Sequence, residues 1–309
     1  MKKWYYNPVL ASSLKTRMRG WRTAASVTAY LGVMLFIAYI FFKIYIEAQA
    51  INGISVNANQ SVGLQVYLTL AIIQFALILL ITPAQTAGVV SSEREMQTLD
   101  LLLCTKMSSA AIIMGKLLSS LGFILLLIIA SIPLFSLVLL FGGIALEDIA
   151  ILFLFYIVTA FGVGSIGVFY STLFKRTVVS TVVTYVTIFF LGIVSVVLGT
   201  YMMAMHYSQP SQPADYYIPF ILYINPGVGL ADLLSTQAGG QYVLPYGIIG
   251  LLIGQVGNIP QGWFQQLPFW VKNIGVISII ATLLLVISTW SIRPNKRMGA
   301  RIWKVRRSG

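Results

Sequence analysis

Residues 117–145 read LLSSLGFILLLIIASIPLFSLVLLFGGIA, a stretch without a charged side chain. A helix needs roughly 20 mostly apolar residues to cross the hydrocarbon layer of a bilayer, and this stretch is longer. Five other stretches share its character: 24–46, 62–90, 149–173, 177–204 and 273–292. Only Lys43 interrupts them, near one end of its stretch, where a long side chain can reach the interface. The sequence therefore predicts an all-α integral membrane protein with about six transmembrane helices.

The composition of the whole chain excludes an ordinary soluble protein. Of its 309 residues, 58% are hydrophobic and only 9% are charged, whereas soluble domains carry about 25% charged residues. A soluble fold of this size could not bury so much apolar surface. The single cysteine, Cys104, excludes an internal disulfide framework, and the single histidine, His206, excludes a histidine-rich metal site.

The basic residues indicate the orientation of the chain. All of the 20 Lys and Arg residues except Lys43 and Lys272 fall in four segments on one side of the predicted membrane: 1–23, 91–116, 175–176 and 293–309. The opposite side carries acidic residues: Glu47, Glu147, Asp148, Asp215 and Asp232. Basic loops stay in the cytoplasm, so both termini and the basic tail 293–309 are expected there. This bias explains the net charge of +12 without nucleic acid as a partner, and it favours contact with anionic membrane lipids.

A long segment, residues 205–271, is expected to be extracellular. Its apolar run 242–256 is shorter than a usual span and contains Pro245 and several glycines. If this run crossed the membrane, the basic tail would move outside, against the charge bias. We therefore expect an interfacial or re-entrant segment on the outer face, before the last span.

Residues 1–23 predict an amphipathic helix on the inner membrane surface. Asn7-Pro8 is typical of a helix start, with Asn7 as the cap and Pro8 in the first turn. Apolar and basic side chains then fall on separate faces: Leu10, Leu14, Met18 and Trp21 on one, and Lys15, Arg19 and Arg22 on the other. The alternative, a basic flank of the first span with no helix of its own, stays open.

The most informative loop is the segment between the second and third spans, residues 91–116. Charged and polar residues surround Leu99 at the start of a leucine run: Glu93, Arg94, Glu95, Thr98 and Asp100. Leu99, Leu102 and Leu103 would share one face of a helix. Such a helix at the inner surface either docks a partner protein or lies on lipid. The residues alone do not choose between these two roles.

Motifs of soluble enzymes and of ion-coupled pumps are missing or misplaced. Gly162-Val-Gly164-Ser-Ile-Gly167 matches a dinucleotide-binding pattern, but it lies in an apolar span, where small residues allow close helix packing. Gly115-Lys116 lacks the upstream glycine of a P-loop, so the chain should not bind ATP by that motif. None of the predicted spans has an acidic residue near its middle, which argues against a secondary transporter.

The inner loop resembles a known family. Residues 92–116 are similar to the E-R-E-x-x-T-L-D-L-L-L segment of ABC-2-type transporter permeases, which begins here at Glu93. Asn7-Pro8-Val9-Leu10 resembles the start of the same proteins, and Asn225-Pro226 resembles an Asn-Pro element before their last span. The resemblance covers most of the chain in order. It departs from the family at 105–108, where Thr-Lys-Met-Ser stands in place of the usual turn with proline.

The resemblance implies one transmembrane permease domain over 1–309 that works as part of a complex. Such permeases pair with a second copy or a paralogue, and each half binds a separate cytosolic ABC ATPase that holds ATP and Mg. The chain itself would then be no enzyme and would carry no cofactor or metal. The N-terminal helix would be a connecting helix, and residues 205–271 would contribute to an outer gate. The residues that would contact the ATPase form a coupling loop: Glu93, Arg94, Glu95, Thr98, Leu99 and Asp100.

The expected function is ATP-driven export across the plasma membrane of a bacterium. The predicted spans offer few polar side chains for a path: Gln65, Gln74, Gln85, Thr82, Ser131, Thr184 and Thr187. A weakly polar path suits an amphipathic substrate better than a small ion. Two alternatives stay open: a membrane scaffold or sensor that has a permease-like fold and transports nothing, and a secondary transporter.

Overall fold

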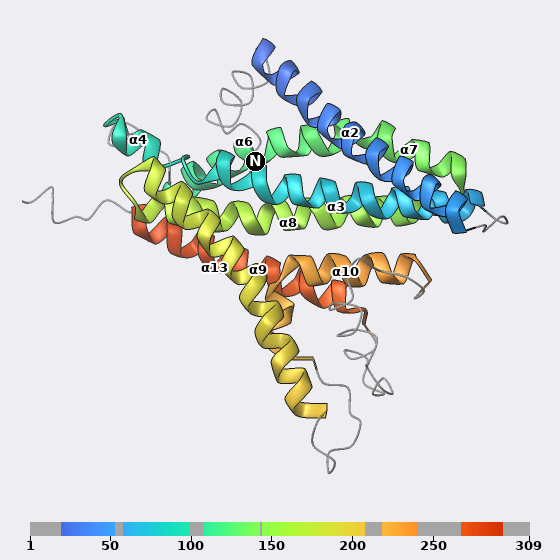
Figure 1. Ribbon diagram of the computed structural model, residues 1–309. Helices are drawn as coiled ribbons and strands as arrows, with labels where there is room; N and C mark the ends of the chain where they lie inside the picture. The colour runs from blue at the N-terminus through green and yellow to red at the C-terminus, as the bar shows by residue number, and fades with distance from the viewer. Residues whose placement is uncertain are drawn as a thin grey trace, which may run out of the picture.

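The computed structural model of the protein describes residues 20–52, 58–98, 108–142, 144–207, 218–239 and 267–292. The regular structure within these residues is entirely helical (Figure 1). The described part of the chain has six segments long and apolar enough to cross a membrane: Thr23–Ile44, Val62–Glu95, Ser109–Leu140, Leu146–Leu173, Thr177–His206 and Phe269–Ile292. The prediction of an all-α integral membrane protein with six spans is confirmed.

The spans are built from helices α2 (Trp21–Asn52), α3 (Ala58–Thr86) with α4 (Ser91–Glu95), α6 (Ser109–Ala130) with α7 (Ile132–Phe141), α8 (Leu146–Leu173), α9 (Thr177–Tyr207) and α13 (Phe269–Ile292). The third span is divided at Ser131 because Pro133 has no N–H to donate to the carbonyl of Ile129. The Ser131 N–H still lies 3.2 Å from the carbonyl oxygen of Leu127. The span therefore bends at this point without coming apart.

Helix α8 lies at the centre of the bundle, in contact with α3, α6, α9 and α13. Its side chains Leu152, Phe155 and Tyr156 are fully buried. The Tyr156 hydroxyl donates to the carbonyl oxygen of Ala71 on α3 at 2.7 Å, so this polar group has a partner in the apolar interior. Figure 1 shows α3 and α8 running together, whereas α2 crosses them and α9 diverges from the bundle.

The glycines at 162–167 are packing residues, as predicted. A Cβ atom at Gly162 would overlap the side chain of Ile277 on α13, and one at Gly167 would overlap Thr86 on α3. A Cβ atom at Gly164 would lie 3.3 Å from Leu117 of α6. The pattern therefore lets three neighbouring helices approach α8 closely.

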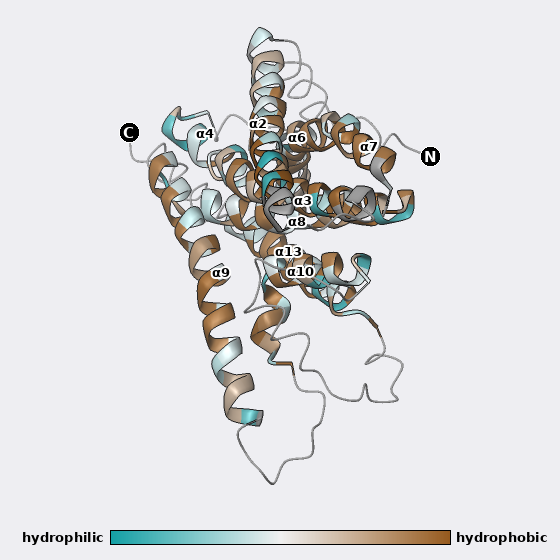
Figure 2. Cartoon of the chain, turned by 45° about the vertical axis from the view of Figure 1, so that its right-hand side comes forward, coloured by the Kyte–Doolittle hydropathy of each residue, from teal (hydrophilic) through white to brown (hydrophobic). Residues whose placement is uncertain are grey.

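Helices α2 and α9 are apolar along much of their length (Figure 2), and many of their apolar side chains are exposed. Among the most exposed are Phe36, Tyr39 and Phe41 on α2, and Val186, Phe189, Phe190 and Tyr201 on α9. Apolar faces of this extent are covered by lipid or by another protein chain.

Residues 218–239, part of the segment 205–271 that is expected to be extracellular, pack against the spans. The 3₁₀ helix η1 (Phe220–Ile224) and α10 (Pro226–Gln237) pack against both α9 and α13, and α10 also contacts α8. The buried residues of α10 run from Val228 to Leu234. A helix of this length cannot span a bilayer. We call residues 218–239 the re-entrant element, because they pack against three spans of the bundle (Figure 1). The run 242–256, predicted to be interfacial or re-entrant, lies outside the described residues.

Several predicted features also fall outside the described residues. They include most of the N-terminal helix, with Leu10, Leu14, Lys15, Met18 and Arg19, and the basic tail 293–309. Arg22 belongs to α2, although only its backbone is described. The amphipathic helix of residues 1–23 stays a prediction.

Candidate functional site

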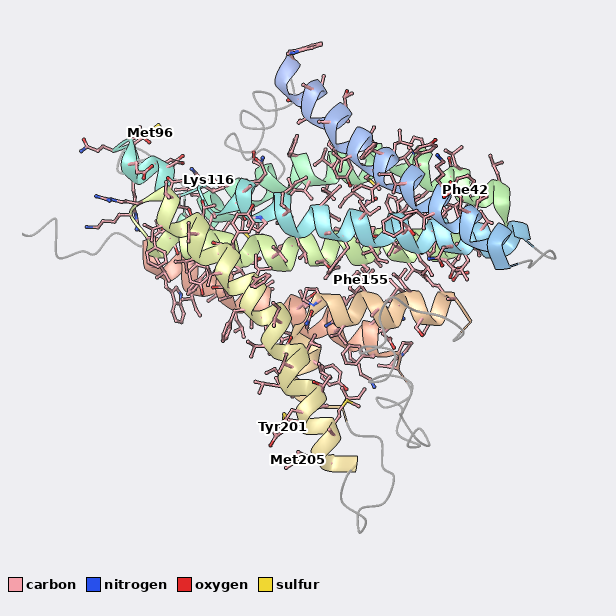
Figure 3. All side chains as sticks on the ribbon, in the orientation of Figure 1. Phe42, Met96, Lys116, Phe155, Tyr201 and Met205 are labelled. Carbon is pink, nitrogen blue, oxygen red and sulfur yellow. The ribbon has the colours of Figure 1, made fainter. Side chains whose placement is uncertain are left out.

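The segment that follows α3 forms a compact projection at the end of the bundle that the charge bias assigns to the cytoplasm. We call this end the inner end, and residues 87–98 the inner element. Backbone bonds from Ala87 N–H to Pro83 and from Ser92 N–H to Gly88 continue α3 into α4 with little interruption. Figure 3 shows Met96 at the tip of the projection and Lys116 beside its base. These bonds bridge the turn between α3 and α4, so the inner element extends from the end of α3.

The inner element is attached to α8 through one buried hydroxyl. The Ser171 oxygen accepts the N–H groups of Val90 at 2.8 Å and of Ser91 at 3.0 Å. These N–H groups lie at the start of α4, where the helix itself offers no acceptor. Because both donors and Ser171 are buried, loss of this hydroxyl would leave two polar groups unpaired in the interior.

A second attachment joins the inner element to α6. The Lys116 ammonium pairs with the Glu93 carboxylate and donates to the carbonyl oxygen of Val89 at 3.0 Å. One turn further along α6, the Ser120 hydroxyl donates to the carbonyl oxygen of Gln85 at 3.1 Å. The Glu93 and Lys116 side chains are only 19% and 11% exposed, so solvent screens this ion pair weakly.

A third attachment joins the inner element to α9. The Glu95 carboxylate accepts the backbone N–H of Thr177 at 2.9 Å and its hydroxyl at 2.7 Å. The Ser180 hydroxyl donates to the carbonyl oxygen of Ala87 at 2.7 Å. Thr177 is the first residue of α9, and a negative charge at a helix N-terminus is favoured by the helix dipole. Glu95 therefore caps α9 from another span.

The structure separates the six predicted coupling residues into different positions. The Glu93 and Glu95 carboxylates bind groups of their own chain. Arg94 is partly exposed. The Thr98 N–H donates to the carbonyl oxygen of Glu93 at 2.9 Å. Leu99 and Asp100 lie outside the described residues. Met96 lies between Glu95 and Thr98 in the sequence and is 65% exposed at the tip of the projection. The partners Ser171, Thr177 and Ser180 were not predicted, although all three are polar residues near the inner ends of their spans.

A second polar cluster surrounds the break between η1 and α10. The Asn225 amide donates to the carbonyl oxygen of Gly192 at 2.9 Å and to the Ser195 hydroxyl at 2.8 Å, both on α9. Its amide oxygen accepts the Gly227 N–H at 2.8 Å and so caps α10. The Asn273 amide of α13 donates to the carbonyl oxygens of Tyr223 and Asn225 at 2.8 and 3.0 Å. Non-helical backbone is tolerated within a membrane protein where the protein satisfies it in this way.

The far half of α10 is fixed to the outer ends of the other spans. The buried Asp232 carboxylate accepts the Trp270 N–H at 3.0 Å, at the start of α13. Burial raises the pKa of Asp232, while the Trp270 N–H and the nearby Lys272 charge act in the opposite direction. The Tyr67 hydroxyl of α3 donates to Gln237 at 2.6 Å, and Gln237 donates to the carbonyl oxygen of Asp148 on α8 at 2.9 Å. The re-entrant element is thus bonded to α3, α8, α9 and α13.

Among the described residues, no group of three or more His, Cys, Asp or Glu side chains is placed to hold a metal ion. Three charged side chains at the inner end bind within the chain: Glu93 pairs with Lys116, Lys116 also donates to a backbone carbonyl, and Glu95 caps a helix N-terminus.

The family of the chain follows from a comparison with known proteins. A family model described as an ABC-2 family transporter protein matches residues 42–290, a range that begins within the first span and ends within the last. The chain belongs to this family and is the membrane component of an ABC-2-type transporter. A comparison with curated proteins finds no match.

Proposed function

We propose that this chain is the permease subunit of an ATP-driven exporter, and that its energy comes from a separate cytosolic ABC ATPase. ATP and Mg bind to that ATPase, and the chain described here catalyses no reaction. Membership of the ABC-2 family supports this proposal. The observation that carries it furthest is the set of bonds joining the inner element to three further spans, α6, α8 and α9.

In this proposal the ATPase docks on the exposed side of the inner element. Met96 and Gln97 are exposed, and Arg94 is partly exposed. Gln97 has φ of 56°, so the chain turns sharply at the tip. Glu93 and Glu95, which the family resemblance places at the ATPase contact, have a further role in this proposal. They hold the inner element to α6 and α9, and they pass its displacement to those helices.

The proposed movement reaches the outer half of the molecule along α9. This helix is held at its inner end by Glu95 and at its middle by Asn225 of the re-entrant element. A rigid helix fixed at both points transfers a displacement from one to the other. ATP binding on the partner would favour one arrangement of α4 and α9 over another, and such a difference in free energy is what any ligand-driven change requires.

The complete transporter would contain a second copy or a paralogue of this chain. The exposed apolar faces of α2 and α9 are candidates for that contact, with lipid covering the remainder. We place the complex in the plasma membrane, with both termini in the cytoplasm, and propose an amphipathic substrate that moves outward. These assignments rest on the basic inner segments and on the low polarity of the spans.

The experiment is purification of the tagged chain in mild detergent, with and without a non-hydrolysable ATP analogue, followed by identification of bound proteins and an ATP-hydrolysis assay. We expect a P-loop ATPase to accompany the wild type and to be lost from a Met96→Asp, Gln97→Asp double variant. Glu147→Gln is the control, because Glu147 is exposed at the first turn of α8 on the opposite side. If the folded wild type carries no ATPase under any of these conditions, the exporter proposal fails and the scaffold or sensor alternative is favoured.

A further inference from the structure

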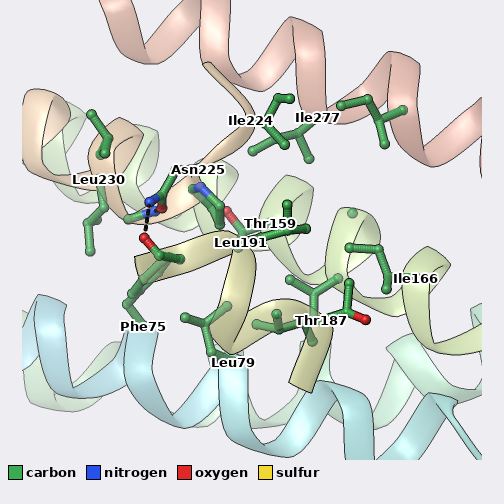
Figure 4. Close-up of a pocket in the computed structure, with 18 of the residues that line it drawn as sticks. Phe75, Leu79, Thr159, Ile166, Thr187, Leu191, Ile224, Asn225, Leu230 and Ile277 are labelled. Atoms are coloured by element: carbon green, nitrogen blue, oxygen red, sulfur yellow. Dashed lines mark hydrogen bonds between the residues drawn. The ribbon is translucent and has the colours of Figure 1, made fainter. Parts of the chain in front are cut away.

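A cavity of about 550 Å³ lies where α9 diverges from the bundle. Its walls come from α3, α8, α9 and α13, and the re-entrant element closes one side (Figure 4). Side chains around it include Phe75 and Leu79 of α3, Ile166 of α8, Leu191 of α9, Leu230 of α10 and Ile277 of α13. The volume lies within the range of about 300–1,000 Å³ that is typical of ligand pockets.

The lining offers almost nothing to a polar ligand. It contains no Asp, Glu, Lys, Arg or His side chain. The Thr187 hydroxyl bonds with the Tyr170 hydroxyl at 3.0 Å and donates to the carbonyl oxygen of Val183 at 2.8 Å. Both ends of the Asn225 amide are bonded within the chain. A ligand that placed a charge here would lose its hydration without gaining a partner.

We infer that this cavity is a binding site for one acyl chain of a membrane lipid. Its walls are spans, so it opens toward the bilayer interior, where hydrocarbon chains are the solvent. Water does not fill an apolar cavity of this kind, whereas a hydrocarbon chain would regain dispersion contacts with the lining. The lipid head group stays at the interface, since the lining has no charged side chain to receive it. Binding of this kind requires neither the ATPase nor export, so it does not depend on the proposed function.

Two pairs of variants separate this site from general lipid contact. Gly192 lines the cavity and has open space where a Cβ atom would lie, so the variant Gly192→Leu places a side chain in the cavity. Gly275 on α13 also has open space at its Cβ position but does not line the cavity, so Gly275→Leu is the control. In the second pair, Ile280→Trp fills the cavity from α13. The neighbouring Ile279 is 61% exposed and does not line the cavity, so Ile279→Trp is the control. Each variant is accepted only if its thermal unfolding midpoint stays near that of the wild type.

The probe is a phosphatidylcholine with a diazirine at the end of one acyl chain, reconstituted with the full chain into nanodiscs, irradiated, and mapped by mass spectrometry. We expect adducts on Leu191, Ile277 and Leu230. A filling side chain displaces several methylene groups of the ligand, so these adducts should fall about tenfold in Gly192→Leu and Ile280→Trp and persist in both controls. The inference is overturned if adducts occur only on outward residues such as Phe189. It is also overturned if the filling side chains leave the adducts on the lining residues unchanged.

Discussion

The Glu95 carboxylate, in the helix that follows α3, receives both the N–H and the hydroxyl of Thr177, the first residue of α9. Glu95 and Thr177 belong to different spans, so the bond joins two elements that the chain connects only through α6, α7 and α8. It combines a charge-assisted hydrogen bond with the favourable position of an anion at a helix N-terminus. This contact joins the inner element directly to α9, one of the helices that line the cavity.

If that contact transmits movement, its removal should separate ATP hydrolysis from transport. We expect Thr177→Val, which removes the hydroxyl but keeps the N–H, to lower ATP-dependent export by about tenfold while the ATPase stays bound. Thr177→Ser should restore most of the export because it restores the hydroxyl. The measurement is export and ATP hydrolysis in proteoliposomes that contain the whole complex. Equal export by the Val and Ser variants would contradict a transmitting role for this bond.

The ion pair between Glu93 and Lys116 gives a stability prediction. Lys116→Met should lower the free energy of unfolding by about 2 kcal/mol, because it leaves a mostly buried carboxylate without its cation and removes the donor to Val89. Adding Glu93→Gln should recover part of this loss, since the unpaired charge is then gone. Thermal unfolding of the single and double variants in detergent completes the cycle. Strictly additive losses would show that the two side chains do not interact in solution.

Much of the membrane fold could be predicted from the sequence, because the physical signal is simple. Six long stretches without charge mark the spans, and bilayer thickness sets the length that each needs. The glycine pattern at 162–167 was correctly interpreted as packing, since an apolar span excludes the water-facing turn of a dinucleotide site. The bonds at the inner end could not be predicted. Ser171 and Thr177 are ordinary polar residues in the sequence, and only the packing of α8 and α9 brings them to the inner element.

The packing of residues 218–239 against the spans was not predicted, although a local signal was present. Helix α10 is too short for a span and contains Asp232, so its hydropathy resembles that of an outer loop. However, Asn225-Pro226 has the same cap-then-proline order that predicted a helix start at Asn7-Pro8. A helix start at Asn225 was therefore available from the sequence. What the residues could not show is that the helix packs inside the bundle, since that depends on acceptors provided by α9 and on donors provided by α13.

The glycine packing is testable at Gly167. A methyl group there would meet Thr86 and would lie 3.2 Å from the backbone N of Ala87, so Gly167→Ala should cost about 1–3 kcal/mol through overpacking. Gly275→Ala, in open space on α13, should be neutral or slightly stabilising because alanine favours helix. The readout is the thermal midpoint in detergent. Thr86→Ala added to Gly167→Ala should recover part of the loss; if it recovers none, the contact is not the cause.

Asn225 makes two kinds of bond, and substitution can separate them. Asn225→Ala removes both the α10 cap and the donors to α9, and should cost about 2–3 kcal/mol, since cap loss alone costs about 1 kcal/mol and an unpaired buried group more. Asn225→Asp keeps an acceptor for the Gly227 N–H, near the favourable N-terminus of α10. A carboxylate, however, has no N–H to donate to the carbonyl of Gly192.

The aspartate variant should therefore be more stable than the alanine variant and yet defective in export. Its cap would hold α10 in place, while α9 would lose the hydrogen bonds that Asn225 donates to it. Ser195→Ala provides the matched control, because it removes only one of the two acceptors on α9 and leaves the Gly192 carbonyl available. The comparison needs thermal unfolding of all three variants together with export by the reconstituted complex. Wild-type export by Asn225→Asp would show that movement reaches the outer half by another route, with Asn225 serving only as a helix cap.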